Sequence, residues 1–282
     1  MKIHLVCIDP QNDFCLDAKN RFGIPAGALY VKGADEDMSR LASFLKKAKK
    51  KIDDVHVTLD SHLPLHIAHP QMWVDSKGVN PNPFTLITNA DVVSGKWRTV
   101  RPLMTKDAAG KRISWADYYT KMLENNKRYV LCIWPPHCLI GSPGAAIHPE
   151  FFEALTEWQL FRVAVVNYVT KGSNFKTEHY SAVMADVEDA SDPTTQLNMP
   201  LIGMLQDPEI NDILITGEAL SHCVANTITD IANNFGEGNI KKFVLLKDTS
   251  SNVGGFEKQG DAFVDAMVKR GMRVTTTKEY LA

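Results

Sequence analysis

Short apolar runs recur along the chain, and stretches with helical spacing of apolar residues separate them. An apolar run of about four to eight residues bounded by turn residues is typical of a buried strand, whereas apolar residues three or four positions apart indicate a helix. The predicted strands are 3–8, 55–59, 129–133, 163–169, 213–216 and 243–246, with a last edge strand at 274–277. The predicted helices are 37–50, 113–123, 149–158, 223–234 and 256–270.

This alternation of apolar strands and helices predicts an α/β fold. We expect three layers, with a doubly wound, mostly parallel sheet of about six strands and helices on both of its faces. Residues 76–127 interrupt the rhythm and are too long for a simple connection. We interpret them, and a smaller segment at about 189–206, as insertions into a single domain spanning 1–282. The larger insertion carries Trp97, Trp115 and Tyr118, and we expect it to cap a site or to make a subunit contact.

Composition excludes several classes of protein. The 282 residues carry a net charge of −2, so the basic surplus typical of nucleic-acid binding is missing. No stretch approaches the ~20 apolar residues of a membrane span, and Asp9 interrupts any signal-peptide core. Five cysteines without a C-x-x-C pair suit free thiols in a reducing compartment. We therefore expect a cytoplasmic protein that binds neither nucleic acid nor membranes.

Cys223 is the strongest candidate nucleophile. It follows the predicted strand 213–216 and stands at the start of a predicted helix. A helix N-terminus carries partial positive charge and unpaired N–H groups, which favour a thiolate and can hold an oxyanion. The alternative is a small cysteine packed in the core. Cys138 is a rival nucleophile or ligand, which we expect to be structural.

A second group of candidates has the chemistry of a metal site. Asp60 and His62 end a predicted strand two residues apart, so their side chains point the same way. His137 follows two prolines after another predicted strand. One carboxylate and two imidazoles suit a catalytic divalent ion with open positions. We expect His66 to be an extra ligand or an outer partner and His69 to be a loop residue; a surface histidine cluster is the alternative.

Asp9 and Lys171 also end predicted strands. Asp9 suits a general base, although aspartate before proline is also a common turn former. Lys171 can assist a developing charge, although a lone lysine at a strand end is usually only solvated. Asp9 and Lys171 share the carboxyl edge of the predicted sheet with Cys223 and the three metal candidates. Ligands bind at this edge in such folds. Their convergence favours an active site.

These motifs together resemble the isochorismatase-like cysteine hydrolases, in particular the nicotinamidase branch. The similar segments are Asp-Pro-Gln-Asn-Asp-Phe (9–14), Asp-Ser-His (60–62), Trp-Pro-Pro-His-Cys (134–138) with Gly-Ser-Pro-Gly (141–144), Lys-Gly (171–172), 217–224 and Lys-Asp-Thr (247–249). Three features differ from the usual pattern: Leu-Ser-His-Cys before the nucleophile (220–223), the long 76–127 segment, and Leu-Pro-Leu-His-Ile-Ala-His at 63–69.

The resemblance implies a role for each candidate. The implied catalytic triad is Asp9, Lys171 and Cys223, and the implied ligands of a zinc-type ion are Asp60, His62 and His137. Phe14 and Trp134 would flank an aromatic substrate ring. A cis peptide bond between Glu218 and Ala219 would aim the N–H groups of Ala219 and Cys223 at the oxyanion.

The activity implied is conversion of nicotinamide to nicotinate and ammonia through a cysteine thioester. Two alternatives stay open: hydrolysis of another small amide, such as a ureido acid or a maleamate-like compound, and a metal-binding homologue without turnover. The metal motif argues against isochorismatase proper, which lacks both the metal and the nucleophilic cysteine. We expect the only partners to be a small amide substrate and further copies of the chain in a homo-oligomer.

Overall fold

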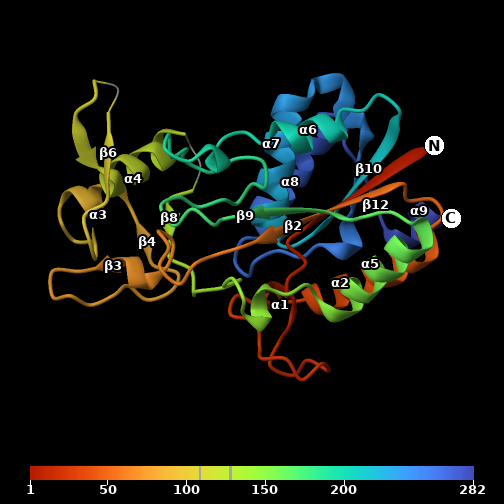
Figure 1. The fold of residues 1–282 in the computed structure, drawn as a ribbon, viewed down its shortest axis with the longest axis horizontal. Helices are drawn as coiled ribbons and strands as arrows, with labels where there is room; N and C mark the ends of the chain where they lie inside the picture. The colour runs from red at the N-terminus through yellow and green to blue at the C-terminus, as the bar shows by residue number, and fades with distance from the viewer. Residues whose placement is uncertain (108, 127–128) are drawn as a thin grey trace.

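A six-stranded parallel sheet forms the centre of the molecule (Figure 1). The computed structural model describes residues 1–107, 109–126 and 129–282; Ala108 and Lys127 of the predicted insertion lie outside the described residues. In spatial order the strands are β12 (Arg273–Thr275), β11 (Phe243–Leu246), β10 (Ile210–Gly217), β1 (Lys2–Ile8), β2 (Asp54–Asp60) and β9 (Asn167–Lys171). Each neighbouring pair is parallel.

Helices cover both faces of this sheet because strand side chains alternate between the faces. Leu5 and Cys7 of β1 pack into one apolar cluster, and Val6 and Ile8 pack into another. The first cluster lies under α2 (Ala34–Ala48) and α5 (Pro149–Arg162), and the second under α7 (Ala225–Phe235) and α8 (Glu257–Lys269). The predicted three-layer α/β fold is therefore confirmed (Figure 1).

The remaining elements are short. The helices are α1 (Asn12–Cys15), α3 (Asn89–Val93), α4 (Trp115–Asn125), α6 (Met199–Leu205) and α9 (Thr277–Leu281). The strands are β3 (Trp73–Val74), β4 (Leu86–Ile87), β5 (Arg98–Thr99), β6 (Met104–Lys106), β7 (Arg112–Ser114) and β8 (Leu131–Cys132). Among the described residues, no helix has the length and apolar character needed to cross a membrane.

Two strand predictions are wrong in detail. The run 129–133 does not join the central sheet; its β8 pairs antiparallel with β4 instead. The predicted strand 163–169 begins late, because α5 continues to Arg162, Val163 takes a left-handed conformation (φ 51°), and β9 starts at Asn167. The sheet still has six strands because the predicted edge strand near 274–277 forms as β12.

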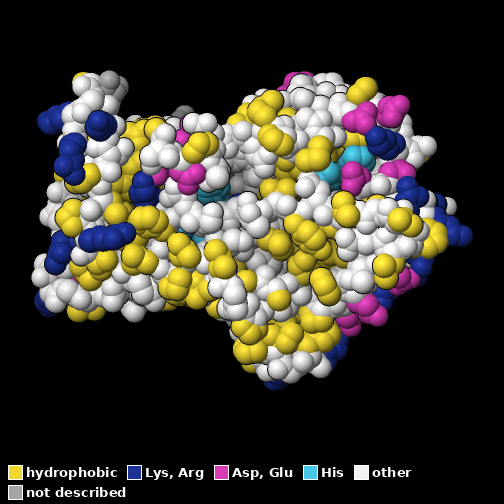
Figure 2. All heavy atoms as spheres, in the orientation of Figure 1, with side chains coloured by type: hydrophobic (Ala, Val, Ile, Leu, Met, Phe, Trp, Pro, Cys, Tyr) yellow, Lys and Arg dark blue, Asp and Glu magenta, His cyan; other side chains and the backbone are white. Residues whose placement is uncertain are grey.

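Residues of the 76–127 segment build a lobe beyond the carboxyl ends of the central strands, at the left of Figure 1. Trp115 and Tyr119 of α4 are buried in the same apolar cluster as Ile8 of β1, and Trp97 packs against that cluster. Exposed lysine and arginine side chains gather on the outer end of the lobe (Figure 2). The division into one domain with two insertions stays a prediction.

Candidate active site and metal centre

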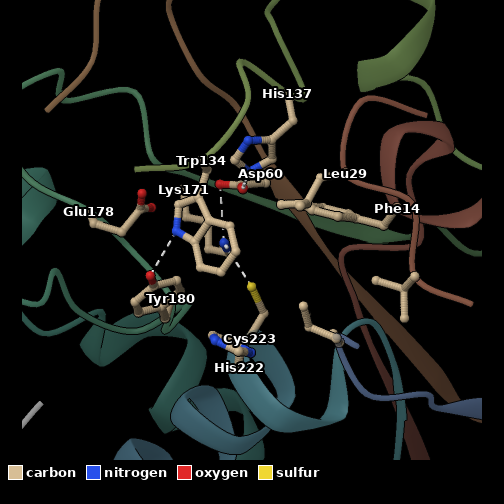
Figure 3. A pocket seen from close by; sticks show the side chains of 13 residues that line it. Phe14, Leu29, Asp60, Trp134, His137, Lys171, Glu178, Tyr180, His222 and Cys223 are labelled. Carbon is tan, nitrogen blue, oxygen red and sulfur yellow. Dashed lines mark hydrogen bonds and ion pairs between the residues drawn. The ribbon is translucent and has the colours of Figure 1, made fainter. Parts of the chain in front are cut away.

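Lys171, the last residue of β9, lies at the centre of the predicted site (Figure 3). Its ammonium nitrogen is 3.0 Å from Asp9 Oδ2 and 3.7 Å from Cys223 Sγ. The same nitrogen donates to the backbone oxygen of His179 at 2.7 Å. Burial lowers the pKa of Lys171, but the Asp60 and Asp9 carboxylates outweigh burial and hold the pKa well above its ordinary value. The structure therefore brings the three predicted catalytic residues together, with the protonated Lys171 in contact with the other two.

Asp9 follows β1 directly and is fully buried. Its backbone is left-handed (φ 44°), a conformation that aspartate tolerates better than most residues. The Thr58 hydroxyl donates to Asp9 Oδ1 at 2.5 Å. Burial raises the pKa of Asp9, and the Lys171 ammonium opposes this effect. A carboxylate with a raised pKa accepts a proton more readily, which suits a general base.

Cys223 lies in a π-helical turn, Leu220–Val224, that leads from β10 into α7. The residue is 7% exposed, and burial raises the pKa of the thiol well above its ordinary value although Lys171 opposes the effect. The sequence favours a resting thiolate, whereas the raised pKa indicates a protonated thiol. The thiol therefore needs a base, and the neighbouring Asp9 carboxylate can act as that base. The peptide bond between Glu218 and Ala219 is cis, as the resemblance implies.

The rival thiol, Cys138, occupies a different environment. It is fully buried and belongs to the apolar cluster under α2 and α5. Its backbone N–H donates to Asp13 Oδ2 at 2.6 Å. Burial raises the pKa of its thiol well above the ordinary value. These contacts fit a structural residue.

The three predicted metal ligands also converge. His62 Nε2 lies 2.9 Å from Asp60 Oδ2, and His137 Nε2 lies 3.4 Å from the same oxygen. His137 reaches this position without a preceding sheet strand, because the chain after it pairs with His62: the His62 N–H donates to the Cys138 carbonyl, and a parallel bridge joins His62 and Leu139. The carboxylate and both imidazoles thus face one point.

The hydrogen bonds around this group fit a bound cation. His62 Nδ1 faces the Gly172 carbonyl at 3.2 Å, and His137 Nδ1 faces the Pro135 carbonyl at 2.9 Å. A carbonyl only accepts, so each Nδ1 carries a hydrogen, and in the neutral imidazole each Nε2 presents a lone pair toward Asp60. His62 Nε2 is buried and has no hydrogen-bond partner. A carboxylate that faces imidazole nitrogens in this way favours positive charge at that point, either a proton on Nε2 or a bound cation.

The electrostatics of His62 also favour positive charge at this point. Burial lowers the pKa of His62, but Asp60 above all, together with Glu178, raises it to about 9. Gly172 allows these groups to approach, because a Cβ there would lie 2.7 Å from Asp60 Oδ1 and 2.9 Å from His62 Cε1. The residue types and their geometry fit a divalent metal ion.

The two remaining histidines of this region differ in their hydrogen bonds. His66 uses both ring nitrogens: Nδ1 accepts from the Ala68 N–H at 3.2 Å, and Nε2 faces the Thr177 carbonyl at 3.1 Å. His69 lies in a loop, as expected, but is buried, and its Nε2 has no hydrogen-bond partner. The geometry therefore suits His66 as an outer neighbour of His62 rather than as a direct ligand.

The predicted ring-binding residues line a pocket above Cys223 (Figure 3). Phe14 and Trp134 are nearly buried, and Trp134 Nε1 donates to the Tyr180 hydroxyl at 2.8 Å. Six further lining residues were not predicted from the sequence: Leu29, Val31, Glu178, Tyr180, His222 and Val253. Most of them lie in irregular segments, where no apolar period marks them; only His222 adjoins a predicted site residue.

No protein-family model matches the sequence. The chain is 27% identical over 101 residues to the nicotinamidase/pyrazinamidase of Mycobacterium tuberculosis, a match that spans 36% of this chain and 44% of that protein. It is 30% identical over 97 residues to the nicotinamidase of Escherichia coli, which spans 34% of this chain and 38% of that protein. The sequence matches thus span less than half the length of these curated relatives.

Solved structures are similar over almost the whole chain. The yeast nicotinamidase Pnc1p superposes with a TM-score of 0.61 at 16% identity, covering 98% of this chain and 99% of that one. PnC1 from L. infantum, in complex with nicotinate, has a TM-score of 0.56 at 20% identity, covering 98% of this chain and 93% of that one. The pyrazinamidase of Pyrococcus horikoshii, in complex with zinc, has a TM-score of 0.52 at 17% identity over 98% and 99%.

The likeness to nicotinamidases and the geometry of the site support each other. A buried lysine, carboxylate and thiol lie beside a carboxylate–histidine group at the carboxyl edge of a parallel sheet. The chain has the nicotinamidase fold along its whole described length and is similar in sequence to curated nicotinamidases over about a third of it.

Proposed function

We propose that the protein is a nicotinamidase-type amidohydrolase that converts nicotinamide to nicotinate and ammonia. The observation that carries the proposal is the contact of one ammonium with both other candidates: Lys171 Nζ lies 3.0 Å from Asp9 Oδ2 and 3.7 Å from Cys223 Sγ. Aromatic side chains line the pocket above the thiol, as a planar ring requires. Among small amides, the likeness to nicotinamidases favours nicotinamide as the substrate.

The first half of the reaction forms a thioester. Phe14 and Trp134 hold the pyridine ring and place the carboxamide carbon against Cys223 Sγ. Asp9 takes the thiol proton while sulfur bonds to carbon, and the backbone N–H groups of Ala219 and Cys223 hold the oxyanion. One such donor typically lowers the barrier by about 2.7–4 kcal/mol. Asp9 then passes its proton to the leaving nitrogen, the carbon–nitrogen bond breaks, and ammonia departs.

The second half hydrolyses the thioester. Water attacks the acyl carbon while Asp9 takes a proton from it. The carbon–sulfur bond then breaks, Asp9 returns this proton to the leaving Cys223 sulfur, and the acid product ionises to nicotinate. Lys171 stays protonated and stabilises the negative charge that moves between Asp9 and the sulfur. Its contacts with Asp9 and with the His179 carbonyl fix its position throughout.

Asp60, His62 and His137 would hold one divalent ion, and we propose zinc. Oxygen and imidazole ligands suit zinc, and the Pyrococcus horikoshii pyrazinamidase is a complex with that metal. When bound, the ion supplies a Lewis acid that can orient the pyridine nitrogen or polarise water. A cytoplasmic location and a homo-oligomeric state stay predictions.

Ammonia release from nicotinamide tests the proposal. We expect purified enzyme to release ammonia, and Cys223→Ala to lose activity by at least about a thousandfold, because loss of a nucleophile removes the covalent route. Cys138→Ala is the matched control: it removes a buried thiol outside the triad and should keep most of the activity. Equal activity of the Cys223 variant would reject the assignment, and faster turnover of a ureido acid or a maleamate-like amide would reject nicotinamide as the substrate.

A further inference from the structure

Glu218 is a buried carboxyl group for which the proposed reaction has no use. It follows β10 directly, is fully buried, and precedes Ala219 of the proposed oxyanion hole. Its Oε2 accepts from the Ser251 N–H at 3.0 Å, whereas among the described residues no N–H or hydroxyl group donates to its buried Oε1. The ionisable groups of β1 and α1 that interact with it are the Cys7 and Cys15 thiols, which supply no positive charge. Such a carboxyl group is costly to ionise.

The partner of Glu218 is Asp37, in the first turn of α2. The two carboxyl groups are hydrogen-bonded to each other, which takes one proton between them. Asp37 is the better place for the negative charge, because Arg40 pairs with its Oδ1 and the Ser251 hydroxyl donates to its Oδ2 at 2.5 Å. The first turn of a helix also favours an anion. Burial and the Asp37 charge raise the pKa of Glu218 well above its ordinary value, so Glu218 holds the proton.

Ser251 links this carboxyl pair to the nucleophile turn, which we define as residues 217–224. Its N–H donates to Glu218, and its carbonyl accepts from the Leu220 N–H at 2.8 Å. Glu218 and Leu220 are the two neighbours of Ala219, so one residue holds the chain on both sides of it. The Glu218 N–H in turn donates to the Ile8 carbonyl of β1 at 2.8 Å. The direction of the Ala219 N–H therefore depends on these anchors.

Two further hydrogen bonds join the segment 250–253 to the nucleophile turn. The Ser250 hydroxyl donates to the Gly217 carbonyl at 2.6 Å, and the Val253 N–H donates to the Ser221 hydroxyl oxygen at 3.1 Å. Neither bond involves Glu218. We therefore expect loss of the Glu218 carboxyl group to loosen the nucleophile turn at Ala219 without unfolding it.

We propose that Glu218 is a positioning residue: its carboxyl group donates to Asp37, accepts from the Ser251 N–H and so holds Ala219 where the oxyanion forms. The inference rests on the thioester mechanism of the proposed function and adds a residue to it. Because the oxyanion exists only after the sulfur attacks, a misplaced donor raises the barrier and leaves substrate binding unchanged. The loss of Glu218 should therefore lower kcat rather than raise KM.

Steady-state kinetics with nicotinamide measure this effect. We expect Glu218→Met, which keeps the length of the side chain and removes both hydrogen bonds, to lower kcat by at least about tenfold and to change KM by less than about threefold. Glu218→Gln should keep kcat within about threefold of the wild type, because its amide can donate to Asp37 and accept from Ser251 as the protonated carboxyl group does. Glu36→Met, at an exposed position of α2, is the matched control and should behave as the wild type.

Three kinetic results would overturn the proposal: wild-type kcat in Glu218→Met, a raised KM with unchanged kcat in that variant, or equal damage in Glu218→Gln. If Glu218→Met does not fold, Ser251→Ala decides, because it removes only the hydroxyl bond to Asp37. A kcat lowered by at least about threefold with unchanged KM in Ser251→Ala would support the proposal, and an unchanged kcat would overturn it.

Hydrogen exchange followed by mass spectrometry tests the positioning without any substrate. We expect faster exchange at 217–224 and 250–253 in Glu218→Met than in the wild type, and unchanged exchange in Glu218→Gln. Unchanged exchange in Glu218→Met would overturn the proposal. If the wild type does not hydrolyse nicotinamide, the proposed function is rejected, and the exchange rates still decide whether Glu218 holds the nucleophile turn.

Discussion

Two groups of histidine and aspartate lie at opposite ends of the same strands. At the carboxyl edge, Asp60 ends β2 and His62 follows it. Near the amino edge, His4 of β1 pairs in register with Asp54 of β2, and His56 lies two residues further along β2. By residue type and spacing, both groups can hold a metal ion. Their hydrogen bonds separate them.

In the amino-edge group the two histidines hydrogen-bond to each other, although His4 Nε2 is buried without a partner. The Asn167 amide nitrogen lies 3.0 Å from His56 Nδ1 and can only donate, so His56 carries its hydrogen on Nε2. That nitrogen lies 3.0 Å from His4 Nδ1 and donates to it. At the carboxyl edge, by contrast, the Nε2 atoms of His62 and His137 both face the Asp60 carboxylate, and each Nδ1 faces a backbone carbonyl. Residue composition alone therefore does not distinguish the two groups; the atoms that face the ring nitrogens do.

Loss of metal should distinguish the two groups most strongly. We expect purified wild type to contain about one divalent ion per chain and His137→Asn to lose it, with an affinity at least about tenfold weaker. His56→Asn, the matched change at the amino edge, should keep the full metal content. Metal analysis after dialysis checks both variants. Retention of metal by His137→Asn, or equal loss of metal in both variants, would contradict the proposed difference between the carboxyl-edge and amino-edge groups.

A smaller effect is expected on the pH dependence of stability. Burial lowers the pKa of His56 to about 4, with Asp54 opposing and His4 adding to the shift. Because the folded-state pKa lies below the ordinary value of 6.5, the His56 contribution to stability is fully present above pH 6.5 and is lost as pH falls toward 4. At 1.36 kcal/mol per unit, the loss amounts to about 3 kcal/mol at most.

Urea unfolding of the metal-free protein at pH 7 and at pH 4.5 measures this loss. Relative to the wild type, His56→Asn should lose less stability between the two pH values, because its side chain does not titrate in this range. A larger loss in the variant than in the wild type would mean that the His4–His56 pair is not held neutral in the folded protein.

The sequence predicts the carboxyl edge well because the residues there end strands of regular period. Lys171 closes β9, Asp60 closes β2 and Asp9 follows β1, so their convergence follows from a parallel sheet alone. The prediction of 129–133 as a central strand is wrong because a short apolar run does not reveal its partner; its β8 pairs with β4 in the lobe.

Glu178 and Tyr180 could not be predicted in the same way. They lie in an irregular segment without hydrophobic period. Their positions depend on tertiary hydrogen bonds: the Glu178 N–H donates to the Tyr119 hydroxyl, and the Trp134 indole N–H donates to the Tyr180 hydroxyl. The raised pKa of the Cys223 thiol was also missed, because it reflects burial by residues distant in sequence rather than the helix start at which the residue stands.

Trapping the covalent intermediate tests the central claim, nucleophilic attack by Cys223 on nicotinamide, most directly. The enzyme is mixed with excess nicotinamide, quenched in acid during turnover, digested and analysed by mass spectrometry. We expect a nicotinoyl group on the peptide that contains Cys223. It should be absent from the Cys223→Ala variant and from the Cys138 peptide. A nicotinoyl group on Cys138 instead, or turnover of nicotinamide by the Cys223→Ala variant at the wild-type rate, would contradict it.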